Sequence, residues 1–138
     1  MEQITILIID DGDDLFRFCR QFMQGTYSIV HARTGHEGLK ILETEVVKLI
    51  ILDKSFDRIN KGELFSGDAD NEGLEILRVL QQLYPQIPVM MVTAHADKNS
   101  RQKALFLGAV EYFSWENICT DIDTMLTSTK RVINSGVM

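Results

Sequence analysis

Ile4-Thr5-Ile6-Leu7-Ile8-Ile9-Asp10-Asp11 is the stretch of sequence that decides the fold, and Lys48-Leu49-Ile50-Ile51-Leu52-Asp53 repeats its pattern. In each stretch a run of apolar residues, rich in isoleucine, ends in acidic side chains. Such a run is typical of a strand that is covered on both faces, as in a parallel sheet. The acids follow at the carboxyl ends of the strands, where open α/β sheets bind their ligands. The two stretches therefore predict a site of three acids at one edge of a sheet.

The composition indicates one globular domain. With 138 residues, of which 45% are hydrophobic, the chain is long enough to bury a core of its own. Its net charge of -6 argues against nucleic-acid binding by this segment, because phosphate recognition needs clustered positive charge. Without a secretory leader or an apolar stretch of membrane-spanning length, we expect a cytoplasmic domain that does not contact a membrane. Cys19 and Cys119 lack a metal-binding spacing, and both are predicted to be buried free thiols.

Strand patterns alternate with helical periodicity along the chain. Besides the two stretches above, strands are predicted at Tyr27–Ala32, Pro88–Thr93 and Ala109–Phe113. Helices are predicted at Leu15–Met23, Glu37–Thr44, Gly73–Tyr84, Ala94–Leu107 and Ile118–Ile133, of which the fourth is more polar than the others. This alternation predicts a doubly wound α/β fold, with a five-stranded parallel sheet in the order 2-1-3-4-5 and helices on both faces. In that order the first and third strands are neighbours, and so are their acids.

Three acids on neighbouring strands predict a metal site. Adjacent strands lie about 4.8 Å apart, so the charges of Asp10, Asp11 and Asp53 would be crowded into one pocket. Like charges that close cannot all stay ionised unaided, and Mg²⁺ suits a small site of carboxylates, a carbonyl and waters. One carboxylate could then attack a phosphoryl donor and form an aspartyl phosphate. The alternative is that these acids cap helices, as Asp13 or Asp14 is expected to do, but the convergence of several strands favours a site.

Five separate parts of the chain resemble the receiver domain of two-component response regulators, and the resemblance extends from about Ile4 to Leu126. The matching parts are Asp10-Asp11 for the acidic pair, Asp53 for the phosphoacceptor, Gly73–Leu77 for the start of the third helix, Val89–Ala94 for the fourth strand and Gly108–Phe113 for the fifth. The resemblance implies the flavodoxin-like receiver fold over residues 1–126, with an insertion at about 57–70. Residues 127–138 would then form the end of the last helix and a linker or tail.

The resemblance also implies a function. Mg²⁺ would be held by the carboxylates of Asp10, Asp11 and Asp53 and by the backbone carbonyl of Ser55. A histidine kinase or a phosphotransfer protein would donate a phosphoryl group to Asp53, after which Thr93 would bond that group and Tyr112 would rotate into the vacated space. Such a domain catalyses at most its own phosphorylation and dephosphorylation, so we do not expect an enzyme in the usual sense. Dimers would form through the fourth helix, the fifth strand and the fifth helix.

The chain departs from this family after the fifth strand, where Ser114-Trp115-Glu116 replaces the usual lysine and proline. An indole cannot give an acyl phosphate the charge-assisted hydrogen bond that an ammonium provides. Lys54 is a candidate substitute, although successive side chains of a strand point to opposite faces.

Three functions therefore stay open. The first is a phosphorylation switch, and the second is an atypical receiver that works without phosphorylation as a protein-interaction module, with Trp115 as a packing or interface residue. A phosphatase is the third and weakest, because the expected general acid two residues after Asp53 is replaced by Ser55.

The second departure is the connection between Asp53 and the third helix, which is about twelve residues longer than usual for its kind. Asp68–Gly73 resembles the start of a calcium loop, but the twelfth position is Val79, which cannot supply the required carboxylate. We expect a solvated acidic loop or a lid that contacts a partner.

The three histidines show no metal-binding spacing. His31 and His36 are expected to lie on the surface or in the core rather than to bind a metal. His95 comes two residues after Thr93 and is expected at the mouth of the pocket, where it could affect the access of water to an acyl phosphate.

Overall fold

The structure is a computed structural model that describes residues 3–56, 61–65, 68–94 and 97–135. Its strands are β1 Thr5–Ile9, β2 Ser28–Ala32, β3 Val47–Asp53, β4 Val89–Thr93 and β5 Glu111–Ser114. The α-helices in these ranges are α1 Asp14–Met23, α2 Gly35–Thr44, α3 Glu72–Leu83, α4 Lys98–Phe106, α5 Trp115–Thr120 and α6 Ile122–Ser135. Two short 3-10 helices, η1 Lys61–Glu63 and η2 Ala69–Asn71, lie between β3 and α3. Within the same ranges, every helix lacks the length or the hydropathy of a membrane span.

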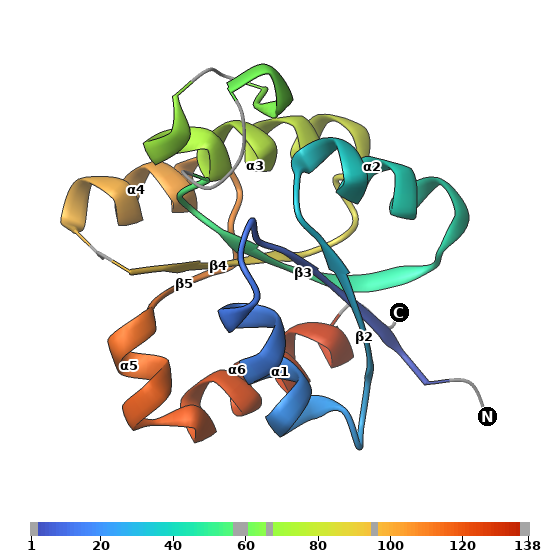
Figure 1. Cartoon of the computed structure of the whole chain (residues 1–138). Coiled ribbons are helices and arrows are strands. Elements are labelled where there is room, and N and C mark those ends of the chain that lie inside the picture. The colour runs from blue at the N-terminus through green and yellow to red at the C-terminus, as the bar shows by residue number, and fades with distance from the viewer. Residues whose placement is uncertain (1–2, 57–60, 66–67, 95–96, 136–138) are drawn as a thin grey trace.

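The strands form one parallel sheet in the order β2-β1-β3-β4-β5, which confirms the predicted topology. Helices α2, α3 and α4 cover one face of the sheet, and α1, α5 and α6 cover the other (Figure 1). β1 lies between β2 and β3, with Ile9 opposite Ala32 on one side and opposite Leu52 on the other. This register places the residues that follow β1 beside Asp53, the last residue of β3.

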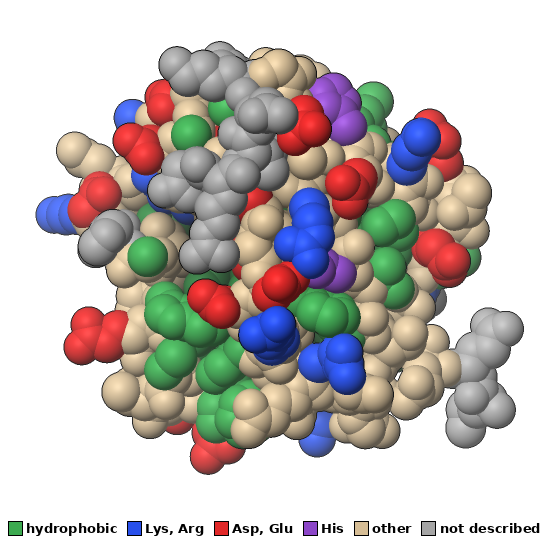
Figure 2. Space-filling model, viewed as in Figure 1, with side chains coloured by type: hydrophobic (Ala, Val, Ile, Leu, Met, Phe, Trp, Pro, Cys, Tyr) green, Lys and Arg blue, Asp and Glu red, His purple; other side chains and the backbone are tan. Residues whose placement is uncertain are grey.

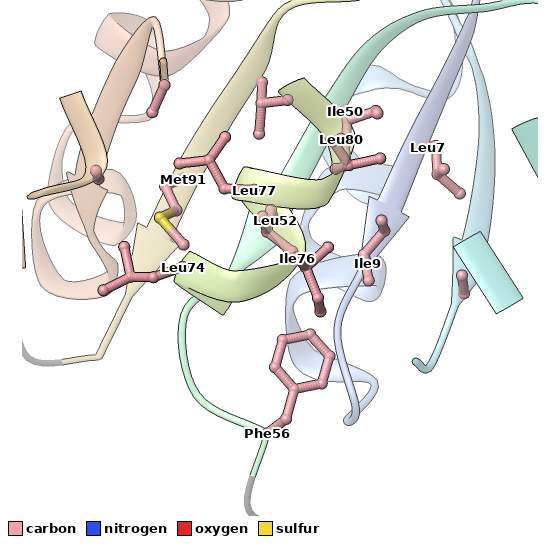
Figure 3. Packing of buried hydrophobic residues seen from close by; sticks show 14 of the residues in the cluster. Leu7, Ile9, Ile50, Leu52, Phe56, Leu74, Ile76, Leu77, Leu80 and Met91 are labelled. Carbon is pink, nitrogen blue, oxygen red and sulfur yellow. The ribbon is translucent and has the colours of Figure 1, made fainter. Parts of the chain in front are cut away.

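Both faces of the central strands are buried, which explains their apolar sequences. Leu7 and Ile9 belong to the cluster on the side of α2 and α3, whereas Ile6 and Ile8 belong to the cluster on the side of α1 and α6. Figure 3 shows the first cluster, in which side chains of α3 lie over those of β1 and β3. Full burial of each such side chain stabilises the fold by roughly 1.5–3 kcal/mol relative to exposure.

The segment after β5 forms two helices, which corrects the prediction of a single helix. Asp121 separates α5 from α6, because its backbone (φ -143°, ψ 75°) is not helical. Its carboxylate accepts hydrogen bonds from the backbone N and the hydroxyl of Thr124, at 3.4 and 2.7 Å. Apolar spacing does not reveal this break, since Ile118 and Met125 on either side of it belong to the same cluster. Residues 127–135 continue as helix α6, in keeping with the predicted end of the last helix. Residues 136–138 lie outside the described residues, so the linker or tail stays a prediction.

Helix α4 begins later than the predicted start at Ala94. Asp97 adopts an extended backbone, and its carboxylate accepts a hydrogen bond from the backbone N of Ser100 at 2.8 Å. This N-cap starts the helix at Lys98, so the helix predicted over Ala94–Leu107 is shortened at its N-terminal end.

The two cysteines are both free, but they differ in exposure. Cys19 is buried as predicted, whereas Cys119 is exposed, which corrects that part of the prediction. Ile118 takes the buried position on α5. The next residue of a helix points about 100° away, so Cys119 faces outward.

The described part of the insertion is anchored to the domain by apolar side chains such as Leu64, while its acidic residues Glu63, Asp68 and Asp70 are exposed, as a solvated acidic loop predicts. Phe56 is fully buried at the N-terminal end of α3 (Figure 3). Its backbone N donates a hydrogen bond to the carbonyl of Ala69 at 2.8 Å, and Leu64 is buried as well. Residues 57–60 and 66–67 of the predicted insertion lie outside the described residues, and its role as a lid for a partner stays a prediction.

Helix α3 begins in direct contact with the end of β3, at a position where only glycine fits. The backbone N of Gly73 donates a hydrogen bond to the carbonyl of Lys54 at 2.8 Å. A Cβ atom at Gly73 would lie 2.3 Å from the backbone oxygen of Asp53 and 2.6 Å from the Cα of Lys54. Both are backbone atoms, so a side chain here could be accommodated only by displacing the end of β3.

Replacing Gly73 with alanine should destabilise the domain by about 2 kcal/mol, because the added methyl group overpacks two backbone segments. Urea unfolding of Gly73→Ala beside the wild type measures the difference. Gly25→Ala is the matched control, since a Cβ atom there meets no atom within 4 Å. The control should change the free energy of unfolding by less than about 0.5 kcal/mol. Equal, small effects of both substitutions would contradict the tight contact at Gly73.

Candidate functional site

Three carboxylates meet at the carboxyl edge of the sheet. Asp10 and Asp11 come directly after β1, and Asp53 is the last residue of β3. Each offers a carboxylate oxygen, and these oxygens all lie within 4.8 Å of one another. The direct pairing of β1 with β3 brings them together, as the two apolar stretches of the sequence predict.

The carboxylates line a pocket of about 170 Å³. Ser55, just after β3, and Thr93, at the end of β4, line the same pocket. Its other described walls come from Gly12, Asp14, Leu15, Val92, Ala94 and Trp115. In Figure 2, acidic side chains lie beside a hydrophobic patch over α1 and α5. The pocket is smaller than the roughly 300–1,000 Å³ typical of sites for drug-sized ligands, so it suits an ion or a small chemical group.

Asp53 lies in surroundings that oppose its ionisation. Burial raises the pKa of Asp53 to about 8, and the neighbouring carboxylates of Asp10 and Asp11 add to the effect. The backbone N of Lys54, 2.9 Å from Asp53 Oδ1, donates a hydrogen bond that acts in the opposite direction but is weaker. Three carboxylates in this position are a set of hard oxygen ligands whose charge needs a counter-ion. The residues present therefore fit Mg²⁺.

Helix capping does not account for these acids. Asp13 is the N-cap residue of α1, but its side chain makes no capping hydrogen bond, contrary to the prediction. Its carboxylate instead pairs with the guanidinium of Arg33 at 2.5 Å. Asp10 Oδ1 accepts a hydrogen bond from the backbone N of Gly12 at 3.2 Å, within the loop that precedes the helix.

Thr93 and Tyr112 lie on neighbouring strands behind the carboxylates. Thr93 is 3% exposed and Tyr112 is 4% exposed. Burial raises the pKa of Tyr112. Within the described part of the chain its hydroxyl has no hydrogen-bond partner of ordinary geometry. The side chains of Thr93 and Ser100 are polar neighbours that partly offset the effect of burial on this pKa. Thr93 therefore faces the pocket, while the Tyr112 ring already lies inside the fold.

Trp115 forms part of the pocket wall just after β5, at the position where the family that the sequence resembles has a lysine. It is the first residue of α5, and its ring packs against that of Phe18 on α1, with the centroids 5.2 Å apart. This confirms a packing role, whereas its position in the pocket is a finding that the sequence analysis missed. The signal was available, since Trp115 directly follows the fifth strand at the edge where the acids gather.

Lys54 does not take the place of the missing lysine. Its ammonium donates a hydrogen bond to the backbone oxygen of Asp70, at 3.0 Å, in the insertion. Among the described residues that line the pocket, none is lysine or arginine.

The two described histidines, His31 and His36, both make contacts within the fold. His36 on α2 packs edge-on against the ring of Phe65, with the centroids 4.3 Å apart, in keeping with a packing role. His31 contacts the loop after β1 and is considered below. His95 lies outside the described residues, so its expected position at the mouth of the pocket stays a prediction.

A family model described as "Response regulator receiver domain" matches residues 6–127, nearly the whole chain. The chain belongs to this family. A relative, the hybrid signal transduction histidine kinase D of Dictyostelium discoideum, is 30% identical over 129 residues, which are 91% of this chain but 8% of that protein. The alkaline phosphatase synthesis transcriptional regulatory protein PhoP of Bacillus subtilis is 27% identical over 110 residues, 79% of this chain and 41% of that protein. The receiver domain thus spans less than half the length of these relatives.

Solved structures share the fold of this receiver domain. The CheY-like receiver domain protein of Methanospirillum hungatei JF-1 has a TM-score of 0.77 at 24% identity, and the match covers 98% of this chain and 97% of that one. The signal receiver domain of an HD domain-containing protein from Pseudomonas fluorescens Pf-5 has a TM-score of 0.78 at 19% identity, with 98% of each chain covered. Receiver domains are signalling domains of two-component systems that bind Mg²⁺ at an acidic pocket, and the carboxylates of Asp10, Asp11 and Asp53 form such a pocket here.

The raised pKa of Asp53 predicts that the metal-free receiver domain loses stability as the pH rises from about 4, the unfolded value, to about 8, the folded value. In this range the folded state holds a proton on Asp53 that the unfolded chain has released, so rising pH favours unfolding. Asp53→Asn removes this titration. In EDTA, thermal unfolding should show a Tm gain for Asp53→Asn near pH 8 that shrinks toward pH 5.

Asp123→Asn is the control for the loss of a carboxylate, because Asp123 is exposed on α6. Its effect on Tm should be small at both pH values. A gain for Asp53→Asn that is the same at both pH values would contradict the raised pKa.

Proposed function

We propose that this receiver domain accepts a phosphoryl group on Asp53 from a phosphohistidine of a histidine kinase or a phosphotransfer protein, and thereby controls a partner or an output domain. The observation that carries the proposal is the meeting of three carboxylates in a small pocket that Thr93 also lines. Membership of the receiver family supports the type of donor. The greater length of the relatives supports an output domain or partner outside this segment.

Mg²⁺ would be held by the carboxylates of Asp10, Asp11 and Asp53 and by the backbone carbonyl of Ser55. When bound, the ion neutralises negative charge on the carboxylates and on the transferring phosphoryl group. Deprotonated Asp53 is the nucleophile, and its carboxylate oxygen attacks phosphorus. As the oxygen–phosphorus bond forms, the bond from phosphorus to the donor imidazole nitrogen breaks, and that nitrogen keeps the electron pair.

Thr93 and Tyr112 would convert phosphorylation into a change of shape. The Thr93 hydroxyl, at the end of β4, would donate a hydrogen bond to a phosphoryl oxygen. β5 pairs with β4, with Tyr112 opposite Met91, so a displacement of β4 would reach the strand that carries Tyr112. Because the Tyr112 ring is already buried, we expect the change at this residue in the hydrogen bonding of its hydroxyl rather than in the burial of an exposed ring.

Incubation of the purified domain with Mg²⁺ and acetyl phosphate should add one phosphoryl group, measured by intact mass. The adduct should be absent in Asp53→Asn, because the amide cannot act as the nucleophile. It should persist in Asp123→Asn, which removes an exposed carboxylate of α6. No adduct on the wild type, or an undiminished adduct on Asp53→Asn, would contradict the proposal.

A second function, a protein-interaction module that works without phosphorylation, is favoured by the chemistry of Trp115. The ammonium that would bond an acyl phosphate is replaced by an indole, which lines the pocket and packs on Phe18. An indole N–H is neutral, so it stabilises a phosphoryl group less than an ammonium does. Phosphorylation could then take place at Asp53 without a strong effect on shape.

The fluorescence of Trp115 separates the two functions, because it is the single tryptophan of the chain. If phosphorylation switches the domain, the adduct should change both the Trp115 emission and the hydrogen exchange of β4, α4 and β5. Asp53→Asn, treated in the same way, is the control and should show neither change. A complete adduct with both signals unchanged would favour the interaction module instead.

Dimerisation through α4, β5 and the helices after β5 is a further part of the proposal. Phe106 of α4 is 90% exposed, and Leu105 of the same helix and Val110, just before β5, are exposed as well. Exposed apolar side chains in this number support a contact with another protein surface. Glu111 pairs with Arg131 within the chain, so this ion pair needs no second subunit.

A further inference from the structure

We propose that His31 and Arg33 are positioning residues that hold the loop after β1 in the shape required for cation binding. They stand at and just beyond the carboxyl end of β2, the strand next to β1. Figure 2 shows a histidine and basic side chains beside acidic ones near the middle of this face, over the end of β2. The inference rests on the proposed magnesium site, and it concerns two residues that do not themselves line the pocket.

His31 fixes the backbone of Asp10. Its Nε2 atom lies 2.9 Å from the backbone oxygen of Asp10, and because a carbonyl oxygen can only accept, Nε2 carries the proton. The imidazole stacks on the ring of Phe16 in α1, with the centroids 4.7 Å apart and the planes 10° from parallel. The backbone N of Asp10 donates to the carbonyl of Ala32 at 3.0 Å. Both backbone polar groups of Asp10 are therefore tied to the end of β2.

Arg33 holds the next part of the loop. One terminal nitrogen of its guanidinium lies 2.5 Å from Asp13 Oδ1, and the other makes a long contact of 3.5 Å with the backbone oxygen of Asp11. The backbone N of Arg33 donates to Glu37 Oε1 at 3.1 Å, which anchors this residue at the start of α2. The pair with Asp13 is exposed and adds little to stability. Its effect is to bridge two points of the loop.

These contacts order the segment that presents two of the three carboxylates. Gly12 lies within this loop, and glycine gives a backbone wide conformational freedom unless other contacts restrict it. Ligands that are held in place before the ion arrives bind it more tightly, because less order has to be created on binding. Loss of the outer contacts that orient metal ligands typically weakens affinity by about 10- to 100-fold.

Removal of the Arg33 side chain can distinguish a positioning role from a purely electrostatic effect on cation binding. Removing a positive group close to three carboxylates should by Coulomb's law tighten the binding of a cation. If Arg33 acts by holding Asp11 and Asp13, its removal should weaken binding in spite of the added negative potential. The two explanations predict changes of opposite sign.

The experiment is a titration of the domain with Mg²⁺ alone, followed by the fluorescence of Trp115, which lines the pocket. In His31→Phe, which keeps an aromatic stack but loses the donor, the Kd should rise about tenfold. His31→Gln keeps an amide donor and should remain within about threefold of the wild type. Arg33→Met should raise the Kd at least about threefold. The matched controls His36→Phe and Arg78→Met change the same residue types on α2 and α3 and should bind Mg²⁺ as the wild type does.

Thermal unfolding of the same variants identifies a merely structural role, which would lower the Tm and leave the Kd unchanged. A wild-type Kd in His31→Phe, or tighter binding in Arg33→Met, would overturn the inference and leave the role of Asp53 as phosphoacceptor intact. Failure of the wild type to bind Mg²⁺ would overturn both the magnesium site and the positioning role.

Discussion

The pairing of β1 with β3 is the constraint on which the rest of this receiver domain depends. It brings the carboxylates of Asp10, Asp11 and Asp53 within 4.8 Å of one another, and burial raises the pKa of Asp53 to about 8. In the absence of a cation this edge of the sheet opposes folding at neutral pH, so stability must come from the apolar clusters on both faces. The same crowding of negative charge favours a cation, so the feature that costs stability is the one that supports function.

The chain around Asp53 is held by contacts that serve structure rather than chemistry. Gly73 of α3 lies directly against the backbone of Asp53 and Lys54. The Lys54 ammonium and the Ser55 hydroxyl both donate to the backbone oxygen of Asp70, at 3.0 and 3.4 Å. The insertion is thereby attached to the residues that follow Asp53, and Lys54 is directed to it. Among the described residues that line the pocket, none is lysine or arginine, and Trp115 forms part of the wall.

Local sequence patterns predicted most of the fold, and particular residues show where they fail. The alternation of strand and helix patterns predicted the sheet order. The apolar runs that end in Asp10 and Asp53 predicted the meeting of the acids, because burial on both faces leaves a clear signal in the sequence. The break at Asp121 leaves no such signal in the sequence, since the hydrogen bond that its carboxylate accepts from Thr124 does not alter apolar spacing. Phe56 went unnoticed as a core residue because it stands alone in a polar stretch without periodicity.

By itself, the sequence determined which chemical groups are available to the domain. These are three acids at the ends of two strands, a threonine at the end of another strand, and an indole in place of a lysine. Tertiary structure alone decided which of these groups meet, placing Trp115 in the wall of the pocket and the His31 imidazole on the backbone of Asp10. The physical reason is that the two kinds of signal act over different distances along the sequence. Apolar periodicity reflects burial, and it can be recognised within the sequence of a single helix or strand. A polar contact instead depends on the register of strands that are far apart in sequence, and on distances of about 3 Å.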